Sequence, residues 1–348
     1  VAIRRRRPVP DDHLGNCLEA DLVVDASGRG SRAPQWLKAL GYTPPEDTVV
    51  NAFLGYASRV YQSPPNPPAE WKTLYLQSKP PVGKRTGLIA PVEGGRWMVT
   101  LSGRGGDYPP TDEAGFLDFA RSLPSSMLYE AIRQAEPLSP IAGYRATENR
   151  LRHFERLARW PEGFVVLGDA ACAFNPVYGQ GMTTAALGAV TLDQCLRSQP
   201  AGPARVHDGL ARRFQRQLAA VNVTPWLLAT GEDHRYPTTV GGRPSRLTRL
   251  QQHYVDQVIR LSTRDPQTRL TFLKVLHLIQ SPRALFGPRV LLGLLRQAFS
   301  FAESEQRSVS SPVHAERRGV SSPVQIVPVQ PAPAGSCRAA RPGLGNVL

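Results

Sequence analysis

The 348-residue chain is predicted to have an α/β fold with an inserted antiparallel β-sheet and a helical C-terminal region. Two short apolar runs, at 20–30 and 163–169, each end in a glycine turn, as buried strands of an α/β sheet do. Between them, segments rich in strand-forming residues are separated by proline and glycine, which favours antiparallel strands. After residue 204, apolar residues recur every three or four positions, which predicts helices.

The first half of the chain contains most of the predicted strands. A short helix is expected at 34–42, where Gly41 provides the stop signal. The four segments that favour β-strands are 48–62, 72–78, 86–94 and 96–104. The last two are joined by Glu93-Gly94-Gly95-Arg96, which predicts a hairpin turn.

Two helices are expected after the hairpin, before the chain returns to the first sheet. The segment 111–123 predicts a helix with Thr111 as its N-cap and acidic residues in its first turn. A second helix is expected at 125–135, and 141–157 is interpreted as one strand that leads back to the α/β sheet.

The C-terminal region is predicted to be helical and then disordered. Helical patterns occupy 206–229, 245–262, 267–280 and 289–301. From Ser304 the chain consists mainly of Ser, Pro, Val and Arg, so 304–348 is expected to be a disordered tail that cannot bury enough apolar area.

Composition and charge argue against several classes of function. The net charge of +14 comes mainly from scattered arginines without interleaved aromatic residues, so no nucleic-acid partner is expected. The dense cluster Arg4–Arg7 is interpreted as an exposed basic loop or strand edge. The sequence contains no run of 18 apolar residues, so no integral membrane segment is expected. Metal-site spacing is absent among the four cysteines, which favours free thiols in the reducing cytoplasm: Cys17, Cys172, Cys195 and Cys337.

The first glycine motif follows the apolar run at 20–25. Gly28-x-Gly30-x-x-Ala33 matches a loose form of the dinucleotide fingerprint. That fingerprint needs a long helix whose N-terminus faces the pyrophosphate, and Pro34 and Pro44 leave space for only a short one. The motif is therefore not interpreted as a primary pyrophosphate site.

The second motif, "GDAACAFNPVYGQGM" at 168–182, follows the second apolar run and is called the GD-like segment below. Asp169 at a strand end only accepts hydrogen bonds, which suits a polyol or a ribose hydroxyl. Gly179 and Gly181 allow positive φ and close backbone approach, and the next helix offers free N–H groups and a positive dipole end. A polyol joined to a ring that becomes anionic on reduction describes a flavin. The alternative is a tight strand–helix connection with Asp169 as a cap.

The GD-like segment resembles the GD motif, close to GDAAHxxxPxxGQGxN, of FAD-dependent class A flavoprotein monooxygenases, the family of aromatic hydroxylases and epoxidases. "ADLVVDASGRGSR" is similar to the DG motif of the same family. The resemblance covers about residues 15–300. It implies that 1–45 and 146–200 belong to an incomplete Rossmann-like FAD-binding domain of the GR2 type, that 46–145 is an antiparallel-sheet substrate domain, and that 201–303 is a helical C-terminal region.

The resemblance also implies roles for individual residues. Gly168 and Asp169 would contact the ribityl chain, with Asp169 binding its hydroxyls. Pro176 would border both the flavin and the substrate. The remaining implied cofactor contacts are Gly179, Gln180 and Gly181 along the ring edge, Met182 at the start of the helix, and Gly28 and Arg29 near the cofactor or the path of NAD(P)H. The sequence departs from the family pattern at Ser27, Cys172 and Thr183, where an acid, His and Asn are usual.

The function implied by the resemblance is an FAD-dependent monooxygenase. It would use NAD(P)H and O₂ to hydroxylate or epoxidise a small hydrophobic aromatic or alkene substrate, and the flavin would supply the oxygen chemistry without a catalytic side chain or metal. One alternative is a flavoprotein resembling geranylgeranyl reductase, which saturates double bonds. Another is a truncated, non-catalytic fragment unable to hold FAD, because no GxGxxG segment precedes Val1.

Overall fold

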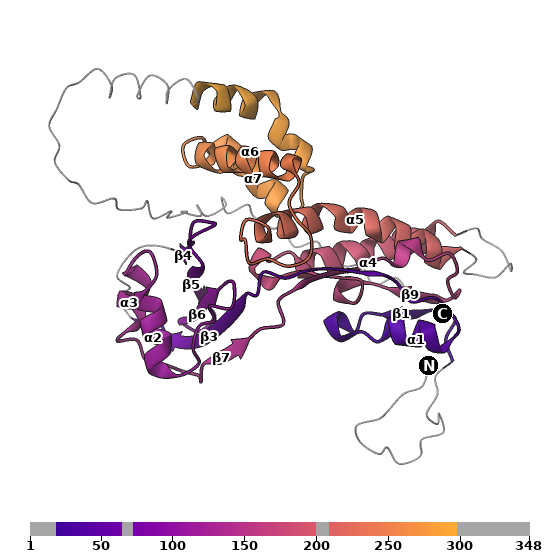
Figure 1. Ribbon diagram of the computed structural model, residues 1–348, viewed down its shortest axis with the longest axis horizontal. Helices are drawn as coiled ribbons and strands as arrows, with labels where there is room; N and C mark the ends of the chain where they lie inside the picture. The colour runs from indigo at the N-terminus through magenta and orange to yellow at the C-terminus, as the bar shows by residue number, and fades with distance from the viewer. Residues whose placement is uncertain (1–18, 65–71, 200–208, 298–348) are drawn as a thin grey trace, which may run out of the picture.

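The computed structural model describes residues 19–64, 72–199 and 209–297. Within these ranges the chain forms three β-sheets together with helices, which confirms the predicted mixed α/β fold. Figure 1 shows an antiparallel sheet with two short helices, two long helices that lie along short strands, and further helices beyond the long pair. The predictions for Arg4–Arg7, Cys17, Cys337 and the tail 304–348 concern residues outside the described ranges.

A pair of parallel strands holds the two glycine motifs side by side. β1 (Val23–Asp25) pairs with β9 (Phe164–Val166), with Val23 opposite Phe164 and Asp25 opposite Val166. α1 (Ala33–Ala39) follows β1 and is short, as predicted, and Gly41 just after it has a φ of 78°. α4 (Gly181–Arg197) and α5 (Leu210–Asp233) pack together beside this pair of strands. Because both motifs follow neighbouring strands in the same direction, they meet at one edge of the sheet.

A three-stranded antiparallel sheet connects this pair to the rest of the molecule. Its strands are β2 (Asp47–Val50), β8 (Asn149–Arg152) and β10 (Cys172–Ala173), with β8 in the middle. β10 belongs to the GD-like segment, so the same sheet positions the start of the loop that follows it.

A five-stranded antiparallel sheet forms the other end of the molecule, in the order β4, β5, β6, β3, β7. Its strands are β3 (Gly55–Gln62), β4 (Leu74–Leu76), β5 (Arg85–Val92), β6 (Arg96–Gly103) and β7 (Ala142–Tyr144). β5 and β6 form the predicted hairpin, and Gly94 and Gly95 in its turn have φ values of 75° and 64°.

Two predicted strands are wrong because each is divided between two sheets. The segment 48–62 contains β2, then a break, then β3. At the break Asn51 bridges to Val240, and its side-chain oxygen accepts a hydrogen bond from the Phe53 backbone N–H at 2.8 Å. The segment 141–157 likewise contains β7 and β8, which belong to different sheets. Both errors occur where the chain crosses between sheets, which strand propensity does not register.

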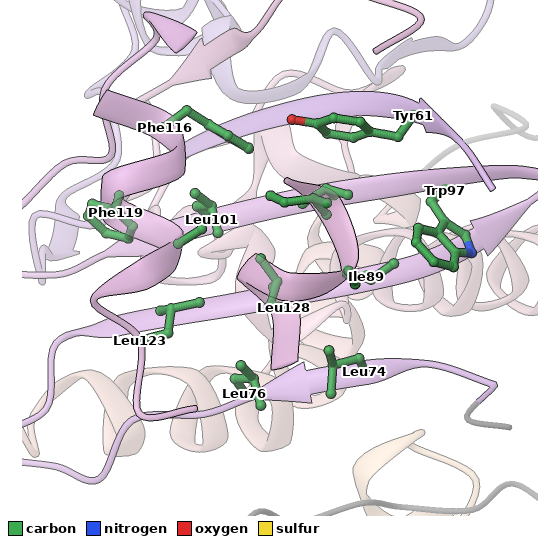
Figure 2. Packing of buried hydrophobic residues seen from close by; sticks show 14 of the residues in the cluster. Tyr61, Leu74, Leu76, Ile89, Trp97, Leu101, Phe116, Phe119, Leu123 and Leu128 are labelled. Carbon is green, nitrogen blue, oxygen red and sulfur yellow. The ribbon is translucent and has the colours of Figure 1, made fainter. Parts of the chain in front are cut away.

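One face of the five-stranded sheet is covered by α2 (Glu113–Arg121) and α3 (Met127–Ile132). Figure 2 shows the buried side chains that gather between these helices and the strands. Phe116, Leu128 and Leu101 are all fully buried there. The predicted N-cap of α2 is wrong: Asp112, and not Thr111, caps the helix, since its carboxylate accepts a hydrogen bond from the Gly115 N–H at 2.8 Å.

The C-terminal region is helical, as predicted. α6 (Arg246–Ser262) and α7 (Pro266–Leu276) pack together, and residues 288–297 form a further helix. These elements share a small apolar core that includes Val258, Val275 and Val290. In the described part of the chain, none of the helices has both the length and the apolar character needed to cross a membrane.

An ion pair at the end of the β5–β6 hairpin leads to a prediction about acid stability. Arg85 donates two hydrogen bonds to Asp107, at 2.7 and 2.8 Å, and this pairing lowers the pKa of the Asp107 carboxyl. A carboxyl with a lowered pKa contributes stability that is present above its unfolded value, about pH 4, and is lost as the pH falls through its folded value. Asp107→Asn is therefore expected to flatten the loss of stability below about pH 4, and to cost no more than about 1 kcal/mol at neutral pH, because the pair is partly exposed.

The measurement is urea unfolding at several pH values for the wild-type chain and the variant. Asp193→Asn is the matched control, because Asp193 pairs with Arg197 on an exposed helix face. If the free energy of unfolding falls below about pH 4 as steeply in Asp107→Asn as in the wild type, the ion pair with Arg85 does not contribute to acid stability.

Candidate functional site

The carboxylate of Asp169 lies at the end of β9, in the 3₁₀ turn Gly168–Ala170. Gly168 has a φ of 64°, so the turn needs a glycine there. Among the described residues, none donates a hydrogen bond to Asp169, although the side chain is half-buried. Burial raises the pKa of this carboxyl, and the charge of Arg29 acts in the opposite direction. The structure therefore presents an acceptor that no described residue uses.

The start of α4 lies beside Asp169. A Cβ atom on Gly181, the first residue of the helix, would stand 3.7 Å from Asp169 Oδ1. The first helical hydrogen bond runs from the Thr184 N–H to the Gln180 carbonyl, and no side chain caps the helix. The N–H groups of residues 181–183 are thus outside the helical ladder, and Gly181 lies next to the unused carboxylate.

The turn before α4 agrees only in part with the sequence expectation. Gly179 has a φ of 65°, and a Cβ there would meet no atom within 4 Å. Gly181, which would also allow a positive φ, is already helical. The freedom of a glycine is therefore needed at Gly179, while at Gly181 the relevant feature is its closeness to Asp169.

Gln180 and Met182, which the resemblance places beside a cofactor, differ strongly in exposure. Gln180 is buried, and its Nε2 donates to the Leu276 carbonyl at 3.1 Å, so it ties the start of α4 to the end of α7. Its Oε1 atom is buried and has no partner among the described residues. Met182, by contrast, is 88% exposed.

The first glycine motif lies next to the GD-like segment. Arg29, in the 3₁₀ turn Gly28–Gly30, donates to the Phe174 carbonyl at 2.7 Å and also to the Glu148 carbonyl. Arg29 thus links the turn to the segment that follows Asp169. The short α1 after this turn agrees with the interpretation that the motif is not a pyrophosphate fingerprint.

Ser27 and Asp25 form part of the same turn. The Asp25 carboxylate accepts hydrogen bonds from the Ser27 N–H at 3.0 Å and from the Ser27 and Ser31 hydroxyls. Asp25 is buried, and these hydrogen bonds fix the turn that contains Gly28 and Arg29. Its oxygens are used by the protein itself, in contrast to those of Asp169.

Pro176 and Cys172 occupy different environments within the GD-like segment. Pro176 is exposed and begins the 3₁₀ turn Pro176–Tyr178. Cys172 lies on β10 and is buried, and burial raises the pKa of its thiol, so it remains protonated at neutral pH.

Sequence reasoning missed a set of polar residues that joins the loop containing Pro176 to α5 and β8. Asp233 at the end of α5, Asn149 on β8 and Tyr178 in the loop are joined by hydrogen bonds of 2.6 and 2.7 Å. Asp233 and Asn149 are completely buried. Nothing in their local sequence marks them, since each is a single polar residue far from the others along the chain.

Comparison with known proteins gives the context of this site. No family model matches the chain. It is 31% identical over 265 residues to Protein Rv3254 of Mycobacterium tuberculosis, an alignment covering 76% of this chain and 55% of that protein. A stretch of 70 residues is 39% identical to a kynurenine 3-monooxygenase of Salinispora tropica, covering 19% of this chain and 16% of that protein.

Among solved structures, the chain is similar to a flavoprotein/dehydrogenase from Cytophaga hutchinsonii, with a TM-score of 0.51 and 16% identity. The superposition covers 81% of this chain and 62% of that one, and it shows a shared fold. The chain spans little more than half the length of the first curated relative.

Proposed function

We propose that the chain is part of an FAD-dependent oxidoreductase, a monooxygenase that uses NAD(P)H and O₂ to hydroxylate or epoxidise a small hydrophobic molecule. The observation that carries this proposal is the unused, half-buried carboxylate of Asp169 beside the uncapped start of α4. The fold shared with a flavoprotein and the stretch similar to kynurenine 3-monooxygenase support it.

The donors and acceptors around Asp169 fit a flavin. Asp169 would accept hydrogen bonds from the hydroxyls of the ribityl chain, because no described residue donates a hydrogen bond to its carboxylate. The N–H groups at residues 181–183, which lie outside the helical ladder, would stabilise a ring that gains negative charge on reduction. Gly168 and Gly179 give the backbone its turns, and Arg29 adds positive charge near the carboxylate. When bound, FAD supplies the redox chemistry, and the chain binds and orients it.

Pro176 is proposed to border the flavin and the substrate, because it is exposed in the loop that follows β10. Tyr56 of β3 donates a hydrogen bond to Asn175 at 2.9 Å, so the loop and that sheet are in direct contact. Gln180 is proposed to act through its backbone, because its side chain is buried against Leu276. Met182, which is exposed, and Gly28, which is half-buried, complete the proposed contacts.

Reconstitution tests the proposal. The purified chain is incubated with FAD and desalted, and the flavin absorbance that stays with the protein is measured. Retained flavin bands in the protein fraction are the expected result. A folded chain that remains colourless at every FAD concentration would contradict the proposal.

A second measurement separates monooxygenation from reduction. Oxygen uptake is followed after NADPH or NADH is added to the reconstituted chain with a panel of aromatic and alkene compounds. Uptake that depends on the compound supports a monooxygenase. Loss of a double bond without oxygen uptake would instead favour a flavoprotein resembling geranylgeranyl reductase.

A further inference from the structure

A network of polar side chains connects α5 and β8 to the loop that joins β10 to α4. Its centre is Asp233, which is 0% exposed at the end of α5. Asp233 Oδ1 accepts the Tyr178 hydroxyl at 2.6 Å, and Oδ2 accepts the Asn149 Nδ2 group at 2.7 Å. Both carboxylate oxygens are therefore used, and both partners lead to the same loop.

The second part of the network holds the loop by its backbone. Asn149 Oδ1 accepts the backbone N–H of Asn175 at 2.7 Å. The Asn175 side-chain oxygen accepts the Tyr56 hydroxyl at 2.9 Å and the Val177 N–H at 3.3 Å. Residues 175–178 are thus fixed from α5, from β8 and from β3. The fixed segment ends one residue before Gly179, whose left-handed conformation sets the direction of α4.

Burial of the Asp233 carboxylate disfavours its charged form. Burial raises the pKa of its carboxyl, and the hydrogen bond from Tyr178 and the charge of Arg104 act against that rise. Arg104 is itself buried and lies over the ring of Tyr236, with 5.0 Å between the guanidinium carbon and the ring centre. A completely buried carboxylate weakens a fold unless its hydrogen bonds are satisfied, so its presence points to a role that an apolar side chain would not fill.

We propose that Asp233 is a positioning residue that holds the loop 175–178 through Tyr178 and Asn149, and so places the turn at Gly179 and the start of α4 for binding FAD. This inference rests on the proposed function of the same site. Without the Asp233 carboxylate, the Tyr178 hydroxyl and the Asn149 amide would be donors without their present acceptors, which is unfavourable for polar groups inside a protein. The loop would shift to find other partners, and the N–H groups at 181–183 would shift with it.

Exchanging the two side chains tests hydrogen bonding separately from side-chain identity. Asp233→Asn alone turns an amide donor towards the Asn149 donor, and Asn149→Asp alone brings two buried carboxylates together. In the double variant, the amide at position 233 donates to the carboxylate at position 149. That carboxylate also accepts the Asn175 N–H, and the amide oxygen at position 233 accepts the Tyr178 hydroxyl. The double variant keeps the net charge and the hydrogen bonds that join position 233 to position 149 and to Tyr178.

Two readouts are used for the wild type, both single variants and the double variant. The first is amide hydrogen exchange at Asn175 and Val177 without FAD, and the second is the Kd for FAD. Each single variant is expected to exchange faster at both amides and to bind FAD at least about 10-fold more weakly, as expected for the loss of one buried hydrogen bond. The double variant is expected to recover most of both losses. Tyr178→Phe removes one hydroxyl and is a milder variant in case a single exchange prevents folding. Asp256→Asn is the matched control, because the Asp256 carboxylate on α6 pairs with Arg235.

The outcomes separate the two proposals. Exchange rates and FAD affinity that stay at wild-type values in folded Tyr178→Phe and in the single variants would overturn the positioning role. A folded double variant that recovers neither readout would also overturn it. If wild type never binds FAD while the exchange rates follow the pattern above, the proposed function fails and the hold of Asp233 on the loop is supported.

Discussion

Replacing Asp169 with alanine is expected to weaken FAD binding by about 10- to 100-fold, because a hydrogen bond to a charged acceptor contributes about 1.5–3 kcal/mol. The thermal stability of the chain without FAD should change little or rise. Asp169 accepts no hydrogen bond from a described residue, and burial raises the pKa of its carboxyl more than the charge of Arg29 lowers it, so the carboxylate adds little to the stability of the chain without FAD. A loss of affinity without a loss of stability marks a binding residue rather than a structural one.

The measurement is an equilibrium titration with FAD, followed by flavin fluorescence, together with thermal unfolding of each protein. Asp193→Ala is the matched control on α4, since Asp193 is exposed and pairs with Arg197 at 2.8 Å. Asp169→Asn should bind FAD with intermediate affinity, because one neutral acceptor remains. An Asp169→Ala protein with the wild-type Kd would show that FAD, if bound, does not contact this carboxylate.

The largest expected effect on stability comes from Phe116→Ala, which should lower the free energy of unfolding by about 3–5 kcal/mol. Phe116 is 0% exposed, and it joins α2 to the core of the five-stranded sheet (Figure 2). Its removal leaves a cavity between layers that cannot close fully, since the strands below are held by their hydrogen-bonded neighbours. Such a loss is a large fraction of the total stability of a typical domain.

Denaturant unfolding followed by circular dichroism measures this change. Tyr144→Ala on β7 is the control, because Tyr144 is 47% exposed and its truncation should cost less than about 1 kcal/mol. If the two substitutions cost the same, α2 would not cover the sheet as the structure describes.

The sequence predicted those features that depend on neighbouring residues. The hairpin at Glu93–Arg96 follows from two consecutive glycines between strand-forming segments. The short α1 and its end before Gly41 follow from local stop signals. The N-cap of α2 was assigned to Thr111 instead of Asp112, because both residue types cap helices and only the final geometry shows which oxygen reaches the Gly115 N–H.

The candidate site divides in the same way. The strand, the turn and the helix of the GD-like segment are contiguous, so the sequence by itself placed Asp169 at a strand end and Gly179 before a helix. The tertiary structure alone decided that Asp169 has no partner among the described residues while the similar carboxylate of Asp25 is fully used. It also brought Asp233 to Asn149, 84 residues away, and to Tyr178, 55 residues away. Local propensity determines the turns, but contacts over such separations depend on how the chain crosses between sheets and on which polar groups burial forces to find a partner.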